Sequence, residues 1–300
     1  MSRRVDASLR ALLAAALATC ALVMAGTARA ATPQTVYFPS GDGRTQLVGY
    51  LYVPAGESAH PAVVMLHGRG GPYSSNVNAG CTTVGQGVVS ACDARTLSKR
   101  HQMWGEYWAS HGYAALLVDS FGPRGRGHGY GRFTHDDPDR EAVNELTVRP
   151  LDAEGALKWL AAQPGIRPDR VMLQGWSNGG STTLNTLQRQ GAAPAGVPRF
   201  RAALAFYPGC GPKALLARGL KLDAPVTLLL GSADEEVSPA TCREVASRSS
   251  GPDGAPRVLW YDGATHDFDD PGKAHQDVPA NRDAQADALR RAAAFFDAAP

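Results

Sequence analysis

The sequence predicts an α/β fold with a mostly parallel central sheet and helices on both faces. Short apolar runs typical of buried strands alternate with helical stretches along the chain, as a parallel sheet requires. A G-x-S-x-G sequence at residues 175–179 lies between a strand-like run, 170–174, and a helix-like run, 180–187. The sequence shows no repeat and no second domain, so one domain with a single large core is expected.

The elements are predicted in order from the N-terminal side. Residues 36–38 and 47–53 are expected to form an antiparallel start of the sheet. Short apolar runs then indicate buried strands at 61–66, 113–118, 170–174, 225–230 and 256–261. Helices are expected at 96–110, 141–162, 178–190, 239–249 and 282–298. Residues 76–93 are rich in glycine, serine and valine and look inserted, so they could form a lid or rim over a pocket.

The first 30 residues have the features of a secretory signal peptide. A basic start precedes an almost wholly apolar run, 11–26, and Ala28-Arg29-Ala30 is a small-x-small cleavage site. We therefore expect cleavage before Ala31, export to the periplasm or the exterior, and a mature domain over residues 31–300.

The apolar run also bears on membrane attachment. It is shorter than the roughly 20 residues that span a bilayer, so no stable membrane anchor is expected. Lipidation at Cys20 is a minor alternative, and Arg3-Arg4 permits a twin-arginine export route.

Most of the positive charge belongs to this leader. Residues 1–30 carry four arginines and one aspartate, a net of +3, so the remainder is about −1 although the whole chain is +2. The basic balance indicates an export signal and not a nucleic-acid surface. The Arg-Gly stretch at 122–132 is too short for RNA binding and is better explained as an active-site loop.

Ser177, at the centre of the G-x-S-x-G sequence, is the predicted nucleophile. A serine at a tight strand-to-helix turn presents its Oγ above the sheet, and the small flanking residues allow strand and helix to approach. The alternative is a glycine-rich helix start at which the serine is only a cap.

A serine nucleophile requires a base and an orienting acid, which in this arrangement follow it in the chain. Asp234 comes directly after the strand at 225–230, and His266 follows the strand at 256–261. Because ligands collect at the carboxyl ends of parallel strands, the three side chains should meet at one rim. Glu235 and Glu236 are rival acids, His275 is a rival base, and Asp234 could instead be an acid at a helix start.

The glycine-rich segment after the strand at 61–66 is a candidate oxyanion hole. Backbone N–H groups of Asn178 and of Arg69 or Gly70 are the expected donors. His67 precedes the serine, so it is interpreted as a loop histidine that holds the turn.

Several motifs together resemble the dienelactone hydrolase family of the α/β-hydrolase superfamily. They are His67-Gly68-x-Gly70-Gly71, residues 118–125, Gly175-Trp176-Ser177-x-Gly179-Gly180, residues 206–210, Gly231-x-x-Asp234 and Gly263-Ala264-x-His266-x-Phe268. The resemblance implies an α/β-hydrolase fold and hydrolysis of esters or lactones without a metal or other cofactor.

Two departures from the family pattern limit what the resemblance implies. Founding members carry a cysteine nucleophile where this chain has Ser177, and a glutamate in the loop aligned with Gly68. Their substrate therefore does not carry over, and a serine carboxylesterase-like activity is the expectation.

The resemblance also suggests substrate-binding residues. Family members hold a substrate carboxylate with an arginine in the loop that here contains Arg124, and with a second one at the position of Asp270. Arg69 could supply the missing charge, and Trp176 is a further candidate for substrate binding. Equally, Arg124 could pair with an acid such as Asp119 and only brace its loop.

Four cysteines remain after loss of the leader, and they permit three pairings. Cys81 with Cys92 would close the inserted segment, and Cys210 with Cys242 would tie a strand-end loop to the helix after Asp234. Disulfides agree with export. None of the four has metal-ligand spacing, so no metal is expected.

The sequence thus predicts an exported serine hydrolase acting on a small ester or lactone, with no nucleic-acid partner and no indication of oligomeric state. A peptidase or polymer-degrading esterase of the same fold is the alternative among enzymes. A binding module that lost the chemistry is the alternative from another class.

Overall fold

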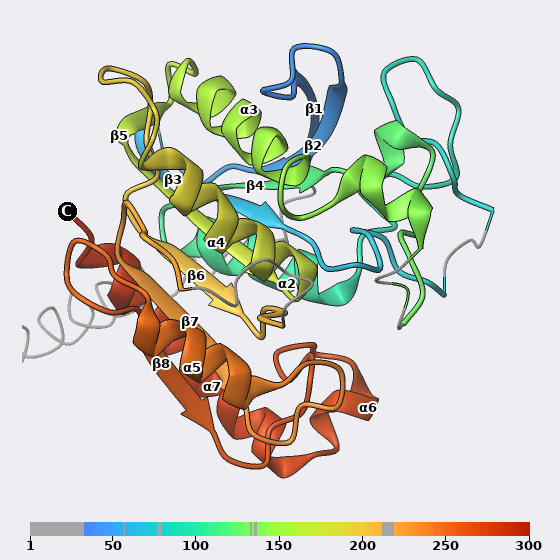
Figure 1. Ribbon diagram of the computed structural model, residues 1–300. Helices are drawn as coiled ribbons and strands as arrows, with labels where there is room; N and C mark the ends of the chain where they lie inside the picture. Colours follow the sequence, from blue (N-terminus) through green and yellow to red (C-terminus); the bar gives the residue numbers. More distant parts are fainter. Residues whose placement is uncertain (1–32, 57, 77–79, 133, 135–136, 212–218) are drawn as a thin grey trace, which may run out of the picture. The chain divides into compact units, whose positions relative to one another are not determined.

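The computed structural model describes residues 33–56, 58–76, 80–132, 134, 137–211 and 219–300 (Figure 1). The predicted signal peptide and part of the 76–93 segment lie outside these residues. Contacts within the chain group Thr32–Pro300 into one unit.

One eight-stranded sheet organises this unit, with the strand order β1-β2-β4-β3-β5-β6-β7-β8. The strands are β1 (Gln34–Pro39), β2 (Gln46–Tyr52), β3 (His60–Leu66), β4 (Ala114–Asp119), β5 (Ile166–Trp176), β6 (Ala203–Phe206), β7 (Val226–Gly231) and β8 (Arg257–Tyr261). β2 pairs antiparallel with β1 and β4, and the other pairs are parallel. The predicted mostly parallel sheet with an antiparallel start is confirmed. The bounds of β6 were not predicted, because its four residues give too short a pattern; only a strand end before Cys210 was expected.

Helices cover both faces of the sheet, as predicted. α3 (Arg149–Ala161), α4 (Asn178–Gln190) and α5 (Pro239–Arg248) pack on one face, and α2 (Lys99–Ser110) and α7 (Pro279–Asp297) on the other. Figure 1 shows α3 and α4 in front of the sheet and α2 behind it. Alternating strand residues feed the two cores: Val64 faces the first set of helices, and Met65 faces Trp104 and Trp108 on α2.

Capping and proline residues set the helix starts that differ from prediction. α2 begins at Lys99 and not at 96, because the Ser98 side chain accepts from the N–H of His101 and caps the helix. α3 begins at Arg149, with Pro150 in its first turn. The preceding Pro138–Val143 is a separate short 3₁₀ helix, η2. α7 begins earlier than predicted, at Pro279.

Two short helices among the described residues were not predicted. η1 (Gly122–Arg124) follows β4, and α6 (Lys273–Gln276) follows the loop that carries His266.

The cysteines form two of the bridges that the sequence permits, Cys81–Cys92 and Cys210–Cys242. The first closes the described part of the inserted segment, and the N–H of Val84 ties that segment to the carbonyl of Gly122 at 3.0 Å. The second joins the loop after β6 to α5.

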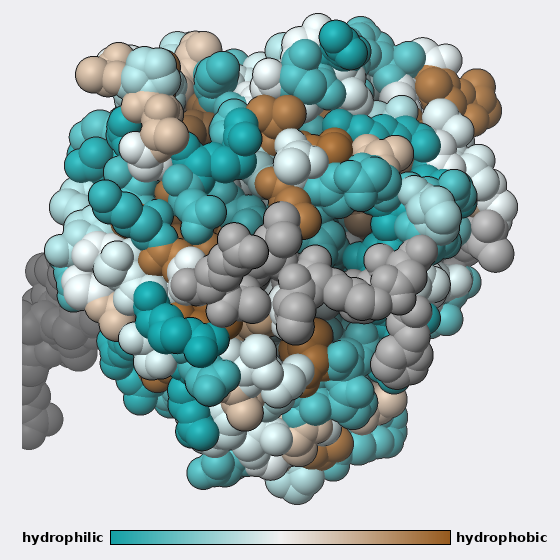
Figure 2. Space-filling view, in the orientation of Figure 1, coloured by the Kyte–Doolittle hydropathy of each residue, from teal (hydrophilic) through white to brown (hydrophobic). Residues whose placement is uncertain are grey.

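On the face drawn in Figure 2, the described residues form no extended apolar patch. Figure 2 shows a mostly hydrophilic face on which hydrophobic residues lie in small separate groups. Among the described residues, no helix combines the length and the apolar character needed to cross a membrane.

Candidate active site

Ser177 occupies a strained turn between β5 and α4. Its backbone has φ 51° and ψ −114°, a conformation that non-glycine residues rarely adopt. The N–H of Ser177 donates to the carbonyl of Phe206 on β6 at 2.9 Å, which helps to hold the turn. Such strain is typical of a nucleophile at a strand-to-helix elbow.

The glycines around Ser177 are required by close backbone approach. A Cβ on Gly175 would lie 2.1 Å from the carbonyl oxygen of Gly179, and one on Gly179 would lie 2.1 Å from that of Leu66. Any side chain there would push α4 away from β5 and β3.

Asp234 and His266 meet in the way that the strand order predicts. Nδ1 of His266 lies 2.8 Å from Oδ2 of Asp234, and both side chains are almost fully buried. The other oxygen, Oδ1, accepts the N–H groups of Glu236 and Val237 at 2.8 and 2.9 Å. Asp234 is thereby fixed, and its contact with Nδ1 leaves Nε2 of His266 free of the Asp234 carboxylate.

Ser177 and His266 line one cavity of about 550 Å³, the active-site cavity. The oxyanion candidates Arg69 and Gly70 line it too. In the part of the chain that is described, Ser177 Oγ makes no hydrogen bond to the imidazole; such bonds are commonly long before substrate binds.

The surroundings of His266 favour its protonated form. Burial alone would lower the pKa of His266, but the hydrogen bond that its ring donates to Asp234 and the charges of Asp267 and Glu236 together raise it. The ring also packs against Tyr207, with centroids 4.6 Å apart. His266 can thus accept a proton readily and hold it during a reaction.

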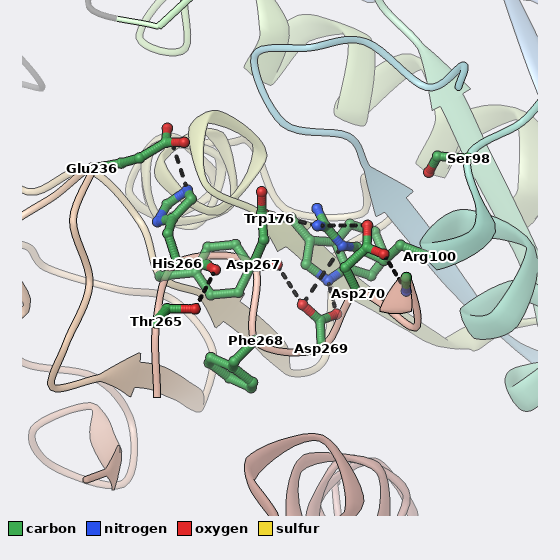
Figure 3. A network of polar contacts seen from close by, with 12 residues as sticks. Ser98, Arg100, Trp176, Glu236, Thr265, His266, Asp267, Phe268, Asp269 and Asp270 are labelled. Carbon is green, nitrogen blue, oxygen red and sulfur yellow. Dashed lines mark hydrogen bonds and ion pairs between the residues drawn. The ribbon is translucent and has the colours of Figure 1, made fainter. Parts of the chain in front are cut away.

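The rival residues have other positions. Glu236 faces Nε2 of His266 from 3.8 Å, as Figure 3 shows. Glu235 accepts the backbone N–H of His266 at 3.1 Å, and its other carboxylate oxygen lies 3.7 Å from the guanidinium of Arg132. His275 lines the cavity, but the Asp234 carboxylate bonds to His266.

Arg69 combines two roles. Its backbone belongs to the Gly68–Gly71 turn, in which the N–H of Gly71 donates to the carbonyl of Gly68 at 3.3 Å. Its guanidinium makes three hydrogen bonds to the Glu236 carboxylate, at 3.0, 3.0 and 3.2 Å, and one to the carbonyl of Tyr130. Arg69 therefore fixes the Glu236 carboxylate beside the histidine.

Asn178 is the first residue of α4, so its backbone N–H has no carbonyl partner four residues earlier in the helix. Its side chain is held from both sides: Nδ2 donates to Glu145 at 2.7 Å, and Oδ1 accepts from the buried guanidinium of Arg149. The same guanidinium donates to the carbonyl of His67 at 2.8 Å. Arg149 thus joins the two segments that carry the oxyanion-hole candidates, a connection that sequence reasoning missed.

His67 serves the turn, as interpreted from the sequence. Its Nε2 accepts the N–H of Ser120 at 3.2 Å, and Nδ1 lies 2.7 Å from the carbonyl of Gly68. Burial and the charge of Arg149 hold the pKa of His67 well below its ordinary value. The ring is therefore neutral, with its proton on Nδ1.

Arg100, on α2, is a further cavity residue that the sequence did not reveal. Its guanidinium lies 2.9 Å from Asp267 and 3.1 Å from Asp270, with Asp269 at 3.6 Å (Figure 3). Burial opposes the charge on Asp267, but Arg100, His266 and other cations lower its pKa to about 2. Asp267 is thus ionised beside the catalytic candidates.

The structure places two of the predicted substrate-binding residues outside the lining of the active-site cavity. Arg124 does not line the cavity: its guanidinium pairs bidentately with the buried carboxylate of Asp152, at 2.8 and 2.9 Å, and not with Asp119. This is the bracing role that the sequence left open. Trp176 is fully buried, and its indole N–H donates to Asp269 at 2.8 Å, because β5 directs this side chain into the core below the cavity.

Two groups of described residues have ligand atoms close enough to surround a metal. Cys81, Cys92 and His128 form one, but its cysteines are joined in a disulfide. The other consists of Glu236, Asp267 and His266. Its carboxylates pair with Arg69 and Arg100, and its histidine is bound by Asp234. The arginines already neutralise the carboxylates that a metal would need.

The sheet topology, the elbow and the Asp–His pair define an α/β-hydrolase. A model of the dienelactone hydrolase family matches residues 78–299, and the chain belongs to that family.

Solved structures share the fold at low sequence identity. A dienelactone hydrolase-like promiscuous phosphotriesterase from metagenomic libraries has 20% identity and a TM-score of 0.61, over 89% of this chain and 97% of that one. A putative dienelactone hydrolase from Klebsiella pneumoniae has 16% identity and a TM-score of 0.62, over 88% and 99%. An esterase from Thermogutta terrifontis with bound propionate has 18% identity and a TM-score of 0.57, over 91% and 96%.

Proposed function

We propose that the protein is an exported serine hydrolase that cleaves carboxylic esters or lactones through Ser177, His266 and Asp234. The observation that carries this proposal is the 2.8 Å contact between Asp234 and His266, which lines a cavity together with the strained Ser177. The esterases among the structural relatives support the same reaction class.

In the proposed mechanism, Ser177 Oγ attacks the carbonyl carbon while Nε2 of His266 takes its proton. The oxyanion accepts hydrogen bonds from the N–H of Asn178 and of Arg69 or Gly70. His266 then gives the proton to the leaving alcohol, and an acyl group remains on Ser177. Water attacks this ester with His266 again as base, which releases the acid. Asp234 keeps the Nδ1 proton in place and stabilises the imidazolium.

Export is part of the proposal. Two disulfides support an oxidising compartment, since cytosolic thiols are kept reduced. Together with the leader-like sequence of residues 1–30, they favour a cleaved periplasmic or secreted protein with one domain over residues 31–300.

Labelling and turnover test the chemistry. A fluorophosphonate probe should modify Ser177 in the wild type and nothing in Ser177→Ala. p-Nitrophenyl acetate hydrolysis should fall by about 10⁴- to 10⁶-fold in that variant. A rate within tenfold of the wild type would overturn the proposal. Absence of any turnover would favour a binding module, and faster cleavage of peptide anilides than of esters would favour a peptidase.

A further inference from the structure

The active-site cavity has an unusually polar lining. Small-molecule sites of roughly 300–1,000 Å³ are mostly lined by hydrophobic side chains. Among the lining residues that the structure describes, no aliphatic side chain is larger than that of Ala274, and Tyr73 is the only phenylalanine, tyrosine or tryptophan. The hydroxyl of Tyr73 is itself engaged with Asp119 at 2.8 Å.

The charged groups of this lining nearly balance. Cations and carboxylates share the wall: Arg69, Lys99, Arg100 and Lys273 against Glu236, Asp267 and Asp270. Serine, asparagine and histidine side chains add further donors and acceptors: Ser74, Ser75, Asn76, Ser98, His101 and His275. A wall of this kind suits a group that both donates and accepts hydrogen bonds, and a hydroxyl does both.

The part of the polar wall around Arg100 is held in place by several contacts. Arg100 is held between Asp267 and Asp270, and Asp269 lies beneath it, bound by the indole N–H groups of Trp104 and Trp176 at 2.7 and 2.8 Å (Figure 3). The N–H of Gly272 donates to Oδ1 of Asp270 at 2.7 Å. The Asp267 and Asp270 side chains remain about one-quarter exposed, so they can still accept from a ligand. Fixed, directional acceptors of this kind discriminate strongly between hydroxylated ligands and their apolar analogues.

A long acyl chain fits this lining poorly. Its burial would strip water from charged side chains and offer no hydrogen bonds in return, which is unfavourable. A ligand with a single charge would match one half of the wall and face repulsion from the other.

We propose that the preferred substrates are short-acyl esters of polyhydroxylated alcohols, such as acetylated sugars. The inference rests on the proposed ester hydrolysis and specifies its substrate class. In that reaction His266 protonates the leaving alcohol, and Asp267, its next neighbour in the chain, would accept hydroxyls of that alcohol.

A matched pair of acetates tests the proposal. In both methyl 6-O-acetyl-glucopyranoside and cyclohexylmethyl acetate, the acetyl ester is on a CH₂ group attached to a six-membered ring. The ring hydroxyls are the principal difference between the two compounds. We expect kcat/KM to be at least about 100-fold higher for the sugar ester, in line with sites that are built to bind hydroxyls. Equal values, or faster cleavage of the cyclohexyl ester, would overturn this inference while leaving the proposed hydrolysis intact. If neither ester is cleaved and the fluorophosphonate leaves Ser177 unlabelled, both proposals fail.

A variant tests whether the polar lining of the cavity causes the preference for the sugar ester. Asp270→Asn should lower the sugar-to-cyclohexyl ratio of kcat/KM by about tenfold, the equivalent of one hydrogen bond to a charged group. Asp283→Asn, an exposed carboxylate on α7, is the matched control and should keep the wild-type ratio. An unchanged ratio in Asp270→Asn would refute the assignment, and if that variant fails to fold, the wild-type ratio alone decides.

Discussion

The carboxylate of Glu236 lies 3.8 Å from Nε2 of His266, whereas Asp234 contacts Nδ1 on the other side of the ring. The imidazole is thus placed between two carboxylates, only one of which has the position of an orienting acid. Arg69 holds the second carboxylate in place and partly offsets its charge.

This arrangement predicts a pH effect. A base must be neutral to act, so kcat/KM should rise with pH through the pKa of His266, which lies above its ordinary value. Glu236→Gln removes a charge that stabilises the imidazolium and leaves Arg69 unpaired, and both changes lower that pKa. The rising limb of the pH profile of kcat/KM, measured with p-nitrophenyl acetate, should therefore move to lower pH.

The control for this experiment is Glu244→Gln, which makes the same charge change on an exposed part of α5. Its normalised profile should coincide with that of the wild type. If the rising limb of the Glu236→Gln profile stayed in place or moved to higher pH, Glu236 would not be raising the pKa of His266.

A second prediction concerns Arg149 as a positioning residue. Arg149→Met removes the donors to His67 and Asn178 and a buried cation near the expected oxyanion. Burial lowers the pKa of Arg149 to about 10, so it is charged at neutral pH. We expect kcat to fall by about 10- to 100-fold, less than for direct loss of an oxyanion donor, with KM little changed.

Two measurements separate this role from general destabilisation. Affinity for a trifluoromethyl ketone, whose adduct carries the oxyanion, should fall in parallel with kcat. Arg149→Lys should recover part of both, because it keeps the charge and one donor. Loss of thermal stability with unchanged kcat in the folded fraction would argue against a positioning role.

The backbone positions of the site were largely predictable, and the side-chain partners were not. Ser177, Asp234 and His266 each follow a strand, and the carboxyl ends of parallel strands share one edge, so local patterns sufficed. Arg100 reaches the His266 loop from α2, across more than 160 residues of chain, and no local pattern records that contact.

The directions in which side chains point could not be predicted from the sequence either. Trp176 adjoins the nucleophile in the chain, yet the strand directs its ring into the core. Arg124 finds its partner Asp152 on α3, because the first turn of that helix packs beside the loop after β4. Both outcomes depend on tertiary packing and not on local propensity.

The Arg124–Asp152 pair leads to a third prediction. Asp152 is fully buried, so Arg124→Ala would leave an unpaired charge in the core and lower the free energy of unfolding by about 3–5 kcal/mol. Adding Asp152→Asn should restore part of the loss. Because Arg124 lies outside the cavity, the ratio of kcat/KM for acidic and neutral esters should equal that of the wild type. A selective loss on the acidic ester would instead support an anion-binding role.

The last prediction compares the two disulfides. The Cys210–Cys242 bridge closes 32 residues and the Cys81–Cys92 bridge closes 11, so chain entropy assigns them roughly 3–4 and just under 3 kcal/mol, respectively. The longer bridge also fastens α5, which follows the Asp234 loop, to the segment whose Gly209 carbonyl accepts from Ser181 on α4.

Cys210→Ser/Cys242→Ser should therefore lower the melting temperature by on the order of 10 °C and reduce esterase activity as well. Cys81→Ser/Cys92→Ser is the matched pair and should show the smaller drop in melting temperature. An equal or larger drop in that second pair, or free thiols at 210 and 242 in the exported protein, would show that the longer bridge does not brace the site.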